Sequence, residues 1–465
     1  MADSANKFIL RDYHSVENAE INLNGITVLA GINGCGKSTL SRWLYGFIHY
    51  SNEYDKIIDY KTAKEIYAHT NQLVDIQRRL AFLTKQSQLP RPIYFTGNVN
   101  TEANRLREKM NEVVLSVSYQ TNEEDKKKSI DFLCNNLGLS LLNQSSDEER
   151  LQEIILKEED FLLGLIHDSE ERKQQSSIDD LYSIMEEGLG SESKAPQKMQ
   201  FSENGTDLLD FDFVVKEWKH LIDGDGNFLV DSDGKHIVVD GITGRFMAPM
   251  GLRRAIYIDS PMAISNNDYT ASHIWHRLKE MLTTPIKPLA EKARPIITEI
   301  RMILGGDIIV KDETISAKEL RYVRKKDGLN ISIDEVATGM KSFAYILRLL
   351  QNGYIDSETL LIIDEPEAHL HPQWVVKFAK ILVLIHKYLG TKIMIASHNP
   401  DMVAAINTIA SVEGLDDATN FYQAYKEPGS LKFSYKGFGN DVSTVFDCFN
   451  IALEHIDAYK PSSGF

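Results

Sequence analysis

Short apolar runs alternate along the chain with longer segments in which apolar residues recur at helical spacing. Core strands are predicted at the largely apolar runs, which are residues 26–30, 254–258, 360–363 and 392–396. Helical spacing predicts helices at residues 38–48, 271–304, 335–350 and 373–389, the second interrupted at Pro285, Pro288 and Pro295. Strands that alternate with helices predict an α/β fold with a parallel core sheet.

An antiparallel β element is predicted before this core. Residues 8–13 and 19–23 are short alternating runs on either side of a polar turn, which is typical of a hairpin. Tyr13 and His14 at the turn either flank a nucleotide base or ribose or are ordinary turn residues, and the sequence leaves both readings open.

A helical insert lobe is predicted between two parts of the core. Residues 100–190 carry apolar positions at helical spacing, and residues 186–206 are rich in Gly, Ser, Pro and Asn, as in a linker or loop. The predicted organisation is the N-terminal part of the core at 1–98, a mostly helical insert with β-hairpins at 99–250, and the C-terminal part of the core at 251–465. Further strands near 420–425 and 431–435 and a helix at 441–453 are expected in the last part.

Composition narrows the class of protein. The chain of 465 residues is 43% hydrophobic and 25% charged, as in ordinary soluble globular proteins. Its net charge of −16 argues against a broadly basic surface for nucleic acid. No apolar stretch approaches the roughly 18 residues of a membrane span and no export leader is seen, so we expect a cytoplasmic protein without membrane contact. The three cysteines have no disulfide or zinc-site spacing.

Residues 31–38, GINGCGKS, match the phosphate-binding pattern G-x-x-x-x-G-K-[ST] in full, between a predicted strand and a predicted helix. Glycines let backbone N–H groups turn toward phosphate oxygens, Lys37 would neutralise the β- and γ-phosphates, and Ser38 would ligate Mg²⁺. The predicted nucleotide-binding residues here are Gly31, Asn33, Gly34, Gly36, Lys37, Ser38 and Thr39.

Two further motifs are predicted to reach the same sheet edge. Asp364 and Glu365 follow the apolar run 360–363, and adjacent carboxylates at a strand end need a cation such as nucleotide-bound Mg²⁺. A strand-helix-strand unit then returns His398 to that edge, within reach of a γ-phosphate. Thr338 and Gly339 open a helix and offer a hydroxyl and free N–H groups, which is another phosphate-binding device.

These motifs together resemble the ABC-type ATPases of the SMC, Rad50, RecF and OLD branch. The first 39 residues look like the N-terminal hairpin and Walker A motif of that family, and ATGMKS at 337–342 is similar to its signature motif. DEPEAHLHP at 364–372 is similar to its Walker B motif with D-loop, and SHNP at 397–400 to its H-loop. The resemblance covers the first 50 residues and roughly 330–405, and the signature departs from the usual pattern at residues 337, 338 and 340.

The resemblance implies an ABC-type P-loop ATPase that binds ATP and Mg²⁺. It implies that Asp364 holds Mg²⁺ together with Ser38, that Glu365 polarises the attacking water, and that His398 is the switch histidine, with Lys37 also counted as catalytic. It further implies that Thr338, Gly339 and Lys341 bind the γ-phosphate of a nucleotide held by another subunit, in a head-to-tail homodimer or a higher oligomer.

Two functions follow. The first is an ATPase subunit of a prokaryotic anti-phage defence system, similar to the Septu-type or PARIS-type ATPases, which acts as sensor or scaffold for a separate effector nuclease and leaves room for DNA or a phage component as a ligand. The alternative is a RecF-like repair or recombination ATPase that clamps DNA, for which the basic cluster to consider is Arg321, Arg324, Lys325 and Lys326. A nuclease site at Asp231 and Asp233 is a third reading, but Asp-Gly steps between apolar runs favour plain hairpin turns.

Overall fold

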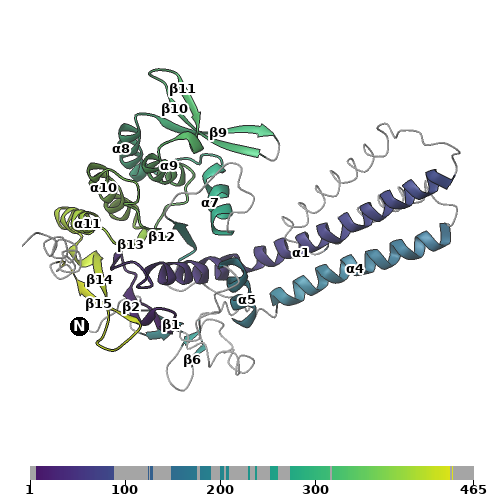
Figure 1. Cartoon of the computed structure of the whole chain (residues 1–465), viewed down its shortest axis with the longest axis horizontal. Helices are drawn as coiled ribbons and strands as arrows, with labels where there is room; N and C mark the ends of the chain where they lie inside the picture. The colour runs from purple at the N-terminus through teal and green to yellow at the C-terminus, as the bar shows by residue number, and fades with distance from the viewer. Residues whose placement is uncertain are drawn as a thin grey trace, which may run out of the picture. The chain divides into compact units, whose positions relative to one another are not determined.

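The fold is described from a computed structural model of the chain (Figure 1). The described residues are 7–87, 124, 126–128, 148–174, 178–189, 199–203, 206–208, 229–230, 236–237, 252–259, 273–314, 317–439 and 442. The chain divides into two compact units: the first is Met1–Asn52, Ser177–Gly241 and Phe246–Phe465, and the second is Glu53–Ser176 with Ile242–Arg245. The predicted boundaries at residues 98 and 250 lie outside the described residues and stay a prediction.

A sheet with a parallel centre forms the framework of the first unit. Its order is β6-β7-β5-β4-β1-β2-β15-β14-β3-β13-β12-β8, and the parallel neighbours run from β14 to β8. The parallel strands are β3 (Ile26–Ala30), β8 (Arg254–Ile258), β12 (Thr359–Asp364), β13 (Lys392–Ser397) and β14 (Thr419–Tyr425). Every residue of β3 and β12 is buried, as expected for strands covered on both faces. The predicted α/β fold is confirmed.

The other end of this sheet is largely antiparallel. Strands β1 (Lys7–Tyr13) and β2 (Val16–Asn22) form the predicted hairpin. Strand β15 (Phe433–Gly439) pairs with β14 on one side and β2 on the other, so the C-terminal part of the chain joins the hairpin to the parallel strands. The remaining strands are β4 (Met199–Glu203), β5 (Thr206–Leu208), β6 (Leu229–Val230) and β7 (His236–Ile237).

Helices of the first unit pack on the parallel strands and bury a continuous apolar core. They are α7 (His273–Thr283), α8 (Arg294–Leu304), α9 (Thr338–Gln351), α10 (Pro372–Leu389) and α11 (Pro400–Val412). The first unit also contains α5 (Ile178–Leu189) and the 3₁₀ turns η3 (Glu291–Ala293), η4 (Ile333–Glu335) and η5 (Asp416–Ala418). The predicted break before Pro285 is confirmed, whereas Pro295 lies in the first turn of α8, where its missing N–H is not needed.

A small antiparallel sheet, β9 (Asp307–Thr314), β10 (Ala317–Arg324) and β11 (Leu329–Ser332), leads into α9. Tyr322 of β10 is buried and donates its hydroxyl to the Leu304 carbonyl at 2.7 Å. This contact fastens the small sheet to the end of α8.

The second unit is built on two long helices, and α1 (Lys37–Ser87) contributes its part from Glu53 onward. The partner is α4 (Glu148–Gln174), which runs antiparallel to it: the early residue Asp59 contacts the late residue Lys173, and His69 lies 4.5 Å from Phe161 between ring centroids (Figure 1). Lys126 joins the same cluster, with Nζ 2.7 Å from Asp59 Oδ1 and 2.8 Å from Glu170 Oε1.

Some sequence predictions lie outside the described residues. They include Asp231 and Asp233 and, apart from Val442, the helix at 441–453. Among the described helices, none is long and apolar enough to cross a membrane.

Candidate functional site

Strand register brings three of the predicted motifs to one edge of the sheet. Ala30, the last residue of β3, pairs with Ser397 of β13, and Asp364, the last residue of β12, pairs with Ala396. The Glu365 N–H then donates to the Ala396 carbonyl at 2.7 Å. Because β3, β13 and β12 are adjacent and parallel, the phosphate loop, the acid pair and the histidine segment all begin at the same level of the sheet.

The phosphate loop follows β3 and owes its shape to its glycines. Gly34 and Gly36 have φ values of 80° and 95°, in the region that favours glycine. A Cβ on Gly36 would lie 2.6 Å from Val16 Cγ2, whereas a Cβ on Gly34 would meet nothing within 4 Å. Gly36 therefore packs against the hairpin, and the exposed positions Asn33 and Gly34 form the open rim of the loop.

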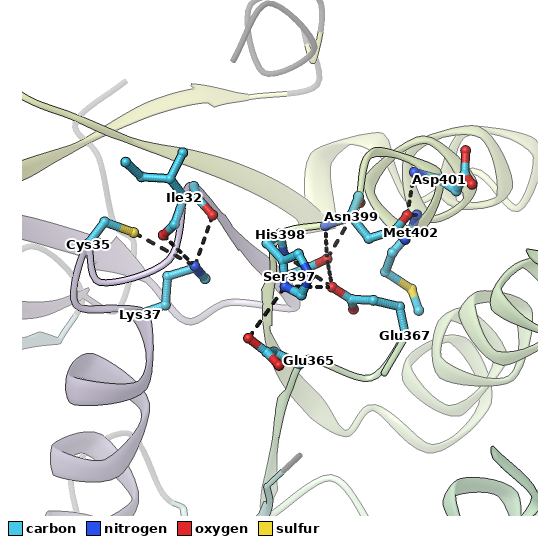
Figure 2. A network of polar contacts seen from close by, with 11 residues as sticks. Ile32, Cys35, Lys37, Glu365, Glu367, Ser397, His398, Asn399, Asp401 and Met402 are labelled. Carbon is cyan, nitrogen blue, oxygen red and sulfur yellow. Dashed lines mark hydrogen bonds and ion pairs between the residues drawn. The ribbon is translucent and has the colours of Figure 1, made fainter. Parts of the chain in front are cut away.

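Lys37 is buried and folds onto its own loop (Figure 2). Its Nζ donates to the carbonyls of Gly31 and Ile32, both at 2.9 Å. The adjacent Cys35 carbonyl accepts a hydrogen bond from the Tyr435 hydroxyl of β15 at 3.1 Å. Ser38, exposed, and Thr39, half-buried, lie in the first turn of α1 directly after Lys37.

Asp364 is nearly inaccessible to solvent, and only one of its two carboxylate oxygens has a hydrogen-bond partner among the described residues. Its Oδ2 accepts a hydrogen bond from the Tyr257 hydroxyl of β8 at 2.7 Å, whereas Oδ1 is buried without a hydrogen-bond partner among the described residues. Burial raises the pKa of Asp364, and the hydroxyls of Tyr257, Ser41 and Ser38 oppose that rise. A buried carboxylate oxygen beside serine hydroxyls is the kind of oxygen ligand set that fits Mg²⁺.

The side chains of Glu365, the residue after Asp364, and His398 lie side by side (Figure 2). His398 Nδ1 is 3.4 Å from Glu365 Oε1, and the two side chains are 42% and 36% exposed, so both can reach a ligand. Glu365 has a φ of 47°, an unusual value for a residue with a side chain. Backbone strain of this kind clusters at functional sites.

Glu367 was given no role from the sequence, although it belongs to the same acidic motif. Its Oε1 accepts hydrogen bonds from the Ser397 hydroxyl at 2.7 Å and from the His398 N–H at 3.1 Å (Figure 2). Burial raises the pKa of Glu367, and the bonds from Ser397 and His398 oppose the rise.

Tyr257 is a second site residue that the sequence did not identify. Its strand could be predicted from the sequence, but the hydrogen bond from its hydroxyl to Asp364 could not.

The signature residues lie beside the segment that follows Asp364. Helix α9 begins at Thr338, and no side chain caps its N-terminus. A Cβ on Gly339 would be 2.9 Å from the His369 carbonyl oxygen, and Lys341 Nζ donates to the Asp334 carbonyl at 3.3 Å. No hydrogen bond between described residues joins these three to the phosphate loop.

The structure is compatible with both interpretations of Tyr13 and His14 at the hairpin turn, as residues that flank a nucleotide base or ribose and as ordinary turn residues. Tyr13 is buried edge-on against Trp43, with ring centroids 5.7 Å apart, and burial raises its pKa to about 12. His14 is exposed and has a φ of 49°.

Residues 26–404 match the protein family described as "AAA domain, putative AbiEii toxin, Type IV TA system". The chain belongs to this AAA-domain family. Membership of the AAA-domain family and the arrangement of the phosphate loop on β3 confirm the predicted P-loop nucleotide-binding class. The roles of the individual site residues stay predictions.

Similarity to other proteins is more local. The Septu protein PtuA of Bacillus thuringiensis is 30% identical over 122 residues, which cover 23% of this chain and 30% of that protein. The chain thus matches less than a third of the length of this curated relative.

Two solved structures show a faint likeness. The SMC head bound to the C-winged helix domain of ScpA has a TM-score of 0.38 at 11% identity, covering 95% of this chain and 99% of that one. The SMC head domain from Thermotoga maritima has a TM-score of 0.35 at 10% identity, covering 94% and 99%. The fold described above rests on strand order and register and not on these values.

Proposed function

We propose that this protein is an ABC-type ATPase that binds ATP and Mg²⁺ at the edge formed by β3, β13 and β12 and hydrolyses the γ-phosphate. The observation that carries the proposal is the register of these strands, which sets the phosphate loop, Asp364–Glu365 and His398 beside one another. Phosphoryl transfer requires this kind of assembly, with a phosphate cradle, a metal ligand and a water-orienting acid close together.

Each residue has a role that its surroundings support. Glycine N–H groups and Lys37 bind the phosphates, and this role is supported by the position of Lys37 Nζ, which lies 2.9 Å from the Gly31 and Ile32 carbonyls of the loop. Ser38 and the free Oδ1 of Asp364 hold Mg²⁺, which neutralises phosphate charge when it is bound. Glu365 orients and polarises the attacking water, and His398 contacts the γ-phosphate.

The site is completed by a second copy of the chain in a head-to-tail dimer. Thr338, Gly339 and Lys341 are placed to bind the γ-phosphate of the partner's nucleotide. Two features support this role: the N-terminus of α9 lacks a side-chain cap, so its first N–H groups are available to an anion, and the motif's own contacts are with Asp334 and His369.

The cellular role we propose is that of a cytoplasmic ATPase subunit in an anti-phage defence system, controlling a separate effector nuclease. Support comes from the local similarity to the Septu protein PtuA and from a family description that names a toxin system.

The alternative function, a DNA clamp, is disfavoured by the ion pairs of the basic cluster that would bind DNA. Arg321 pairs with Glu319 at 2.8 Å and Arg324 with Asp327 at 2.6 Å, so both arginine charges are already matched. Steeply salt-dependent DNA binding by the isolated protein would revive the clamp.

The first test replaces the water-orienting acid. Glu365→Gln should slow ATP hydrolysis by about 100-fold or more and leave ATP binding within about threefold, because it removes water activation and keeps the phosphate contacts. The ATP-bound variant should accumulate as a dimer in light scattering. Lys37→Ala is the matched comparison and should weaken ATP binding itself. Normal turnover in Glu365→Gln would contradict the proposal.

The second test asks whether two copies build each site. Lys37→Ala removes a phosphate-binding residue of the phosphate loop, and Lys341→Glu removes one of the signature motif. Each variant alone should therefore be inactive. A mixed dimer contains one site with an intact loop from one copy and an intact signature from the other. Mixing should therefore restore activity, and two variants that stay inactive together would show that each copy completes its own site.

A further inference from the structure

We infer that Glu367 is a positioning residue that holds the His398 loop in the geometry needed for hydrolysis. The inference rests on the proposed function, because it assigns to Glu367 the placement of a side chain that is proposed to meet the γ-phosphate. It differs from the role of Glu365, although the two acids are two residues apart.

The two glutamates differ in exposure and in what they touch. The Glu365 side chain is 36% exposed, whereas that of Glu367 is 3% exposed. Glu367 is therefore sealed from the space a nucleotide or water would occupy, and it acts through its neighbours. The partners of its carboxylate are Ser397, the last residue of β13, and His398, the next residue.

A single carboxylate oxygen of Glu367 organises that segment. Oε1 accepts from the Ser397 hydroxyl and from the His398 backbone N–H, so it binds one side-chain group and one backbone group in the two residues that lead to the imidazole. The Ser397 hydroxyl also accepts from the Asn399 N–H at 3.0 Å. Asn399 in turn caps α11 by accepting from the N–H groups of Asp401 and Met402. The loop is thus fixed from Glu367 to the first turn of a helix.

The imidazole itself faces two carboxylates. His398 Nδ1 is 3.5 Å from Glu367 Oε1 and 3.4 Å from Glu365 Oε1. A ring nitrogen between two carboxylate oxygens carries the hydrogen, because oxygen lone pairs would repel its own lone pair. Nε2 is then left for the ligand, and the carboxylates set the orientation of the ring in the way that carboxylates orient metal-binding histidines.

The cost of burying Glu367 supports a specific role. A carboxylate removed from water costs several kcal/mol unless its oxygens are bonded. Here Oε2 is buried without a hydrogen-bond partner among the described residues, so the cost is only partly offset. A glutamate at position 367 is explained if its carboxylate oxygen is needed to accept hydrogen bonds from the His398 loop.

The experiment compares Glu367→Ala, Glu367→Gln and His398→Ala with the wild type. Glu367→Ala should lower kcat by about 10- to 100-fold, as is typical when an orienting partner is removed, and leave the Kd for ATP within about threefold. Glu367→Gln retains an acceptor oxygen and should recover most of kcat. In the His398→Ala background, Glu367→Ala should lower kcat by less than about twofold, because the residue acts through His398. Glu358→Ala, at an exposed acid away from the site, is the control.

A measurement that does not depend on ATP hydrolysis tests the role of Glu367 separately from the proposed function. ¹⁵N NMR of histidine-labelled protein, with the His398 signal assigned from His398→Ala, should show Nδ1 protonated in the wild type and a shifted signal in Glu367→Ala. An unchanged signal, or equal losses of kcat in the presence and absence of His398, would overturn the inference. If Glu367→Ala does not fold, Ser397→Ala, which removes the hydroxyl that donates to Glu367, provides the NMR comparison. Absence of ATP hydrolysis by the wild type would instead contradict the proposed function, and the NMR result would still decide the role of Glu367.

Discussion

Two clusters of buried charge, one in each unit, are built in opposite ways. In the second unit, Lys126 and Lys173 both contact Asp59 and Glu170, and the lysines lower the pKa of Glu170 although burial opposes them. At the sheet edge of the first unit, Asp364 and Glu367 have raised pKa values and each keeps one buried oxygen without a partner in the described part of the chain.

The difference separates charges that support structure from charges that are held for a ligand. Buried ions that are matched by opposite charges hold segments together, and removing one partner leaves the other uncompensated. Buried carboxylates with free oxygens cost stability until a cation or donor arrives, which is common at functional sites. Substitutions in the two clusters should therefore have opposite consequences for activity and stability.

The largest effect should come from Asp364→Asn. Hydrolysis should fall by at least about 100-fold, because the amide is a poor ligand for Mg²⁺ and carries no charge. The melting temperature without nucleotide should stay the same or rise, since the amide oxygen can still accept from Tyr257 and a half-satisfied charge is gone. Calorimetry and a phosphate-release assay measure the two quantities. An Asp364→Asn variant that loses both stability and activity would contradict the view that this charge is held for a ligand and does not support the structure.

Lys126→Met should act in the other direction. Removing this buried cation should lower the free energy of unfolding by about 3 kcal/mol, because Asp59 and Glu170 lose a shared partner. Lys128→Met is the matched control: Lys128 is 64% exposed and its ion pair with Glu124, which is 75% exposed, lies in solvent, so its loss should change stability by about 0.5 kcal/mol or less. Limited proteolysis and calorimetry should rank the two variants. Equal stabilities would contradict a structural role for the Lys126 cluster.

The smallest effect should be the pH dependence of stability, with a different sign in the two clusters. The pKa of Glu170 is lowered in the folded protein, so its stabilising contribution is present above the unfolded pKa and is lost as the pH falls through the folded pKa. The pKa of Glu367 is raised, so its cost is present near neutral pH and is relieved as the pH falls through the raised folded pKa. Unfolding curves from pH 7 to about pH 3 should show the wild type gaining stability relative to Glu367→Gln as the pH falls, and losing it relative to Glu170→Gln at the acid end of this range. The same trend in both comparisons would refute the assignment.

The strands and loops that carry the site could be predicted because their signals are local. The apolar runs before Gly31 and Asp364, the glycine spacing around Lys37, and the strand that ends before His398 are each contained in a short stretch of sequence. The structure places all of them at one edge, as expected from parallel strands.

The partners of those residues could not be predicted, because they depend on tertiary packing. Tyr257 and Asp364 are 107 positions apart, and Lys173 is 114 positions from Asp59. Hydropathy identifies Tyr257 as a strand residue and Lys173 as a helix residue but does not say what either side chain meets. The role of Glu367 was missed for the same reason, since its bonds connect two loops that follow different strands.

The position of β15 has a consequence for how the protein is made. This strand lies between β2 and β14, and its Tyr435 holds the Cys35 carbonyl from 400 positions away. At ribosomal rates of about 5 to 20 residues per second, roughly 20 to 80 seconds pass between synthesis of the two partners. During that interval the apolar strands β1 to β3 have emerged without the neighbours that cover them. Newly made chains should therefore depend on chaperones until β15 has been synthesised.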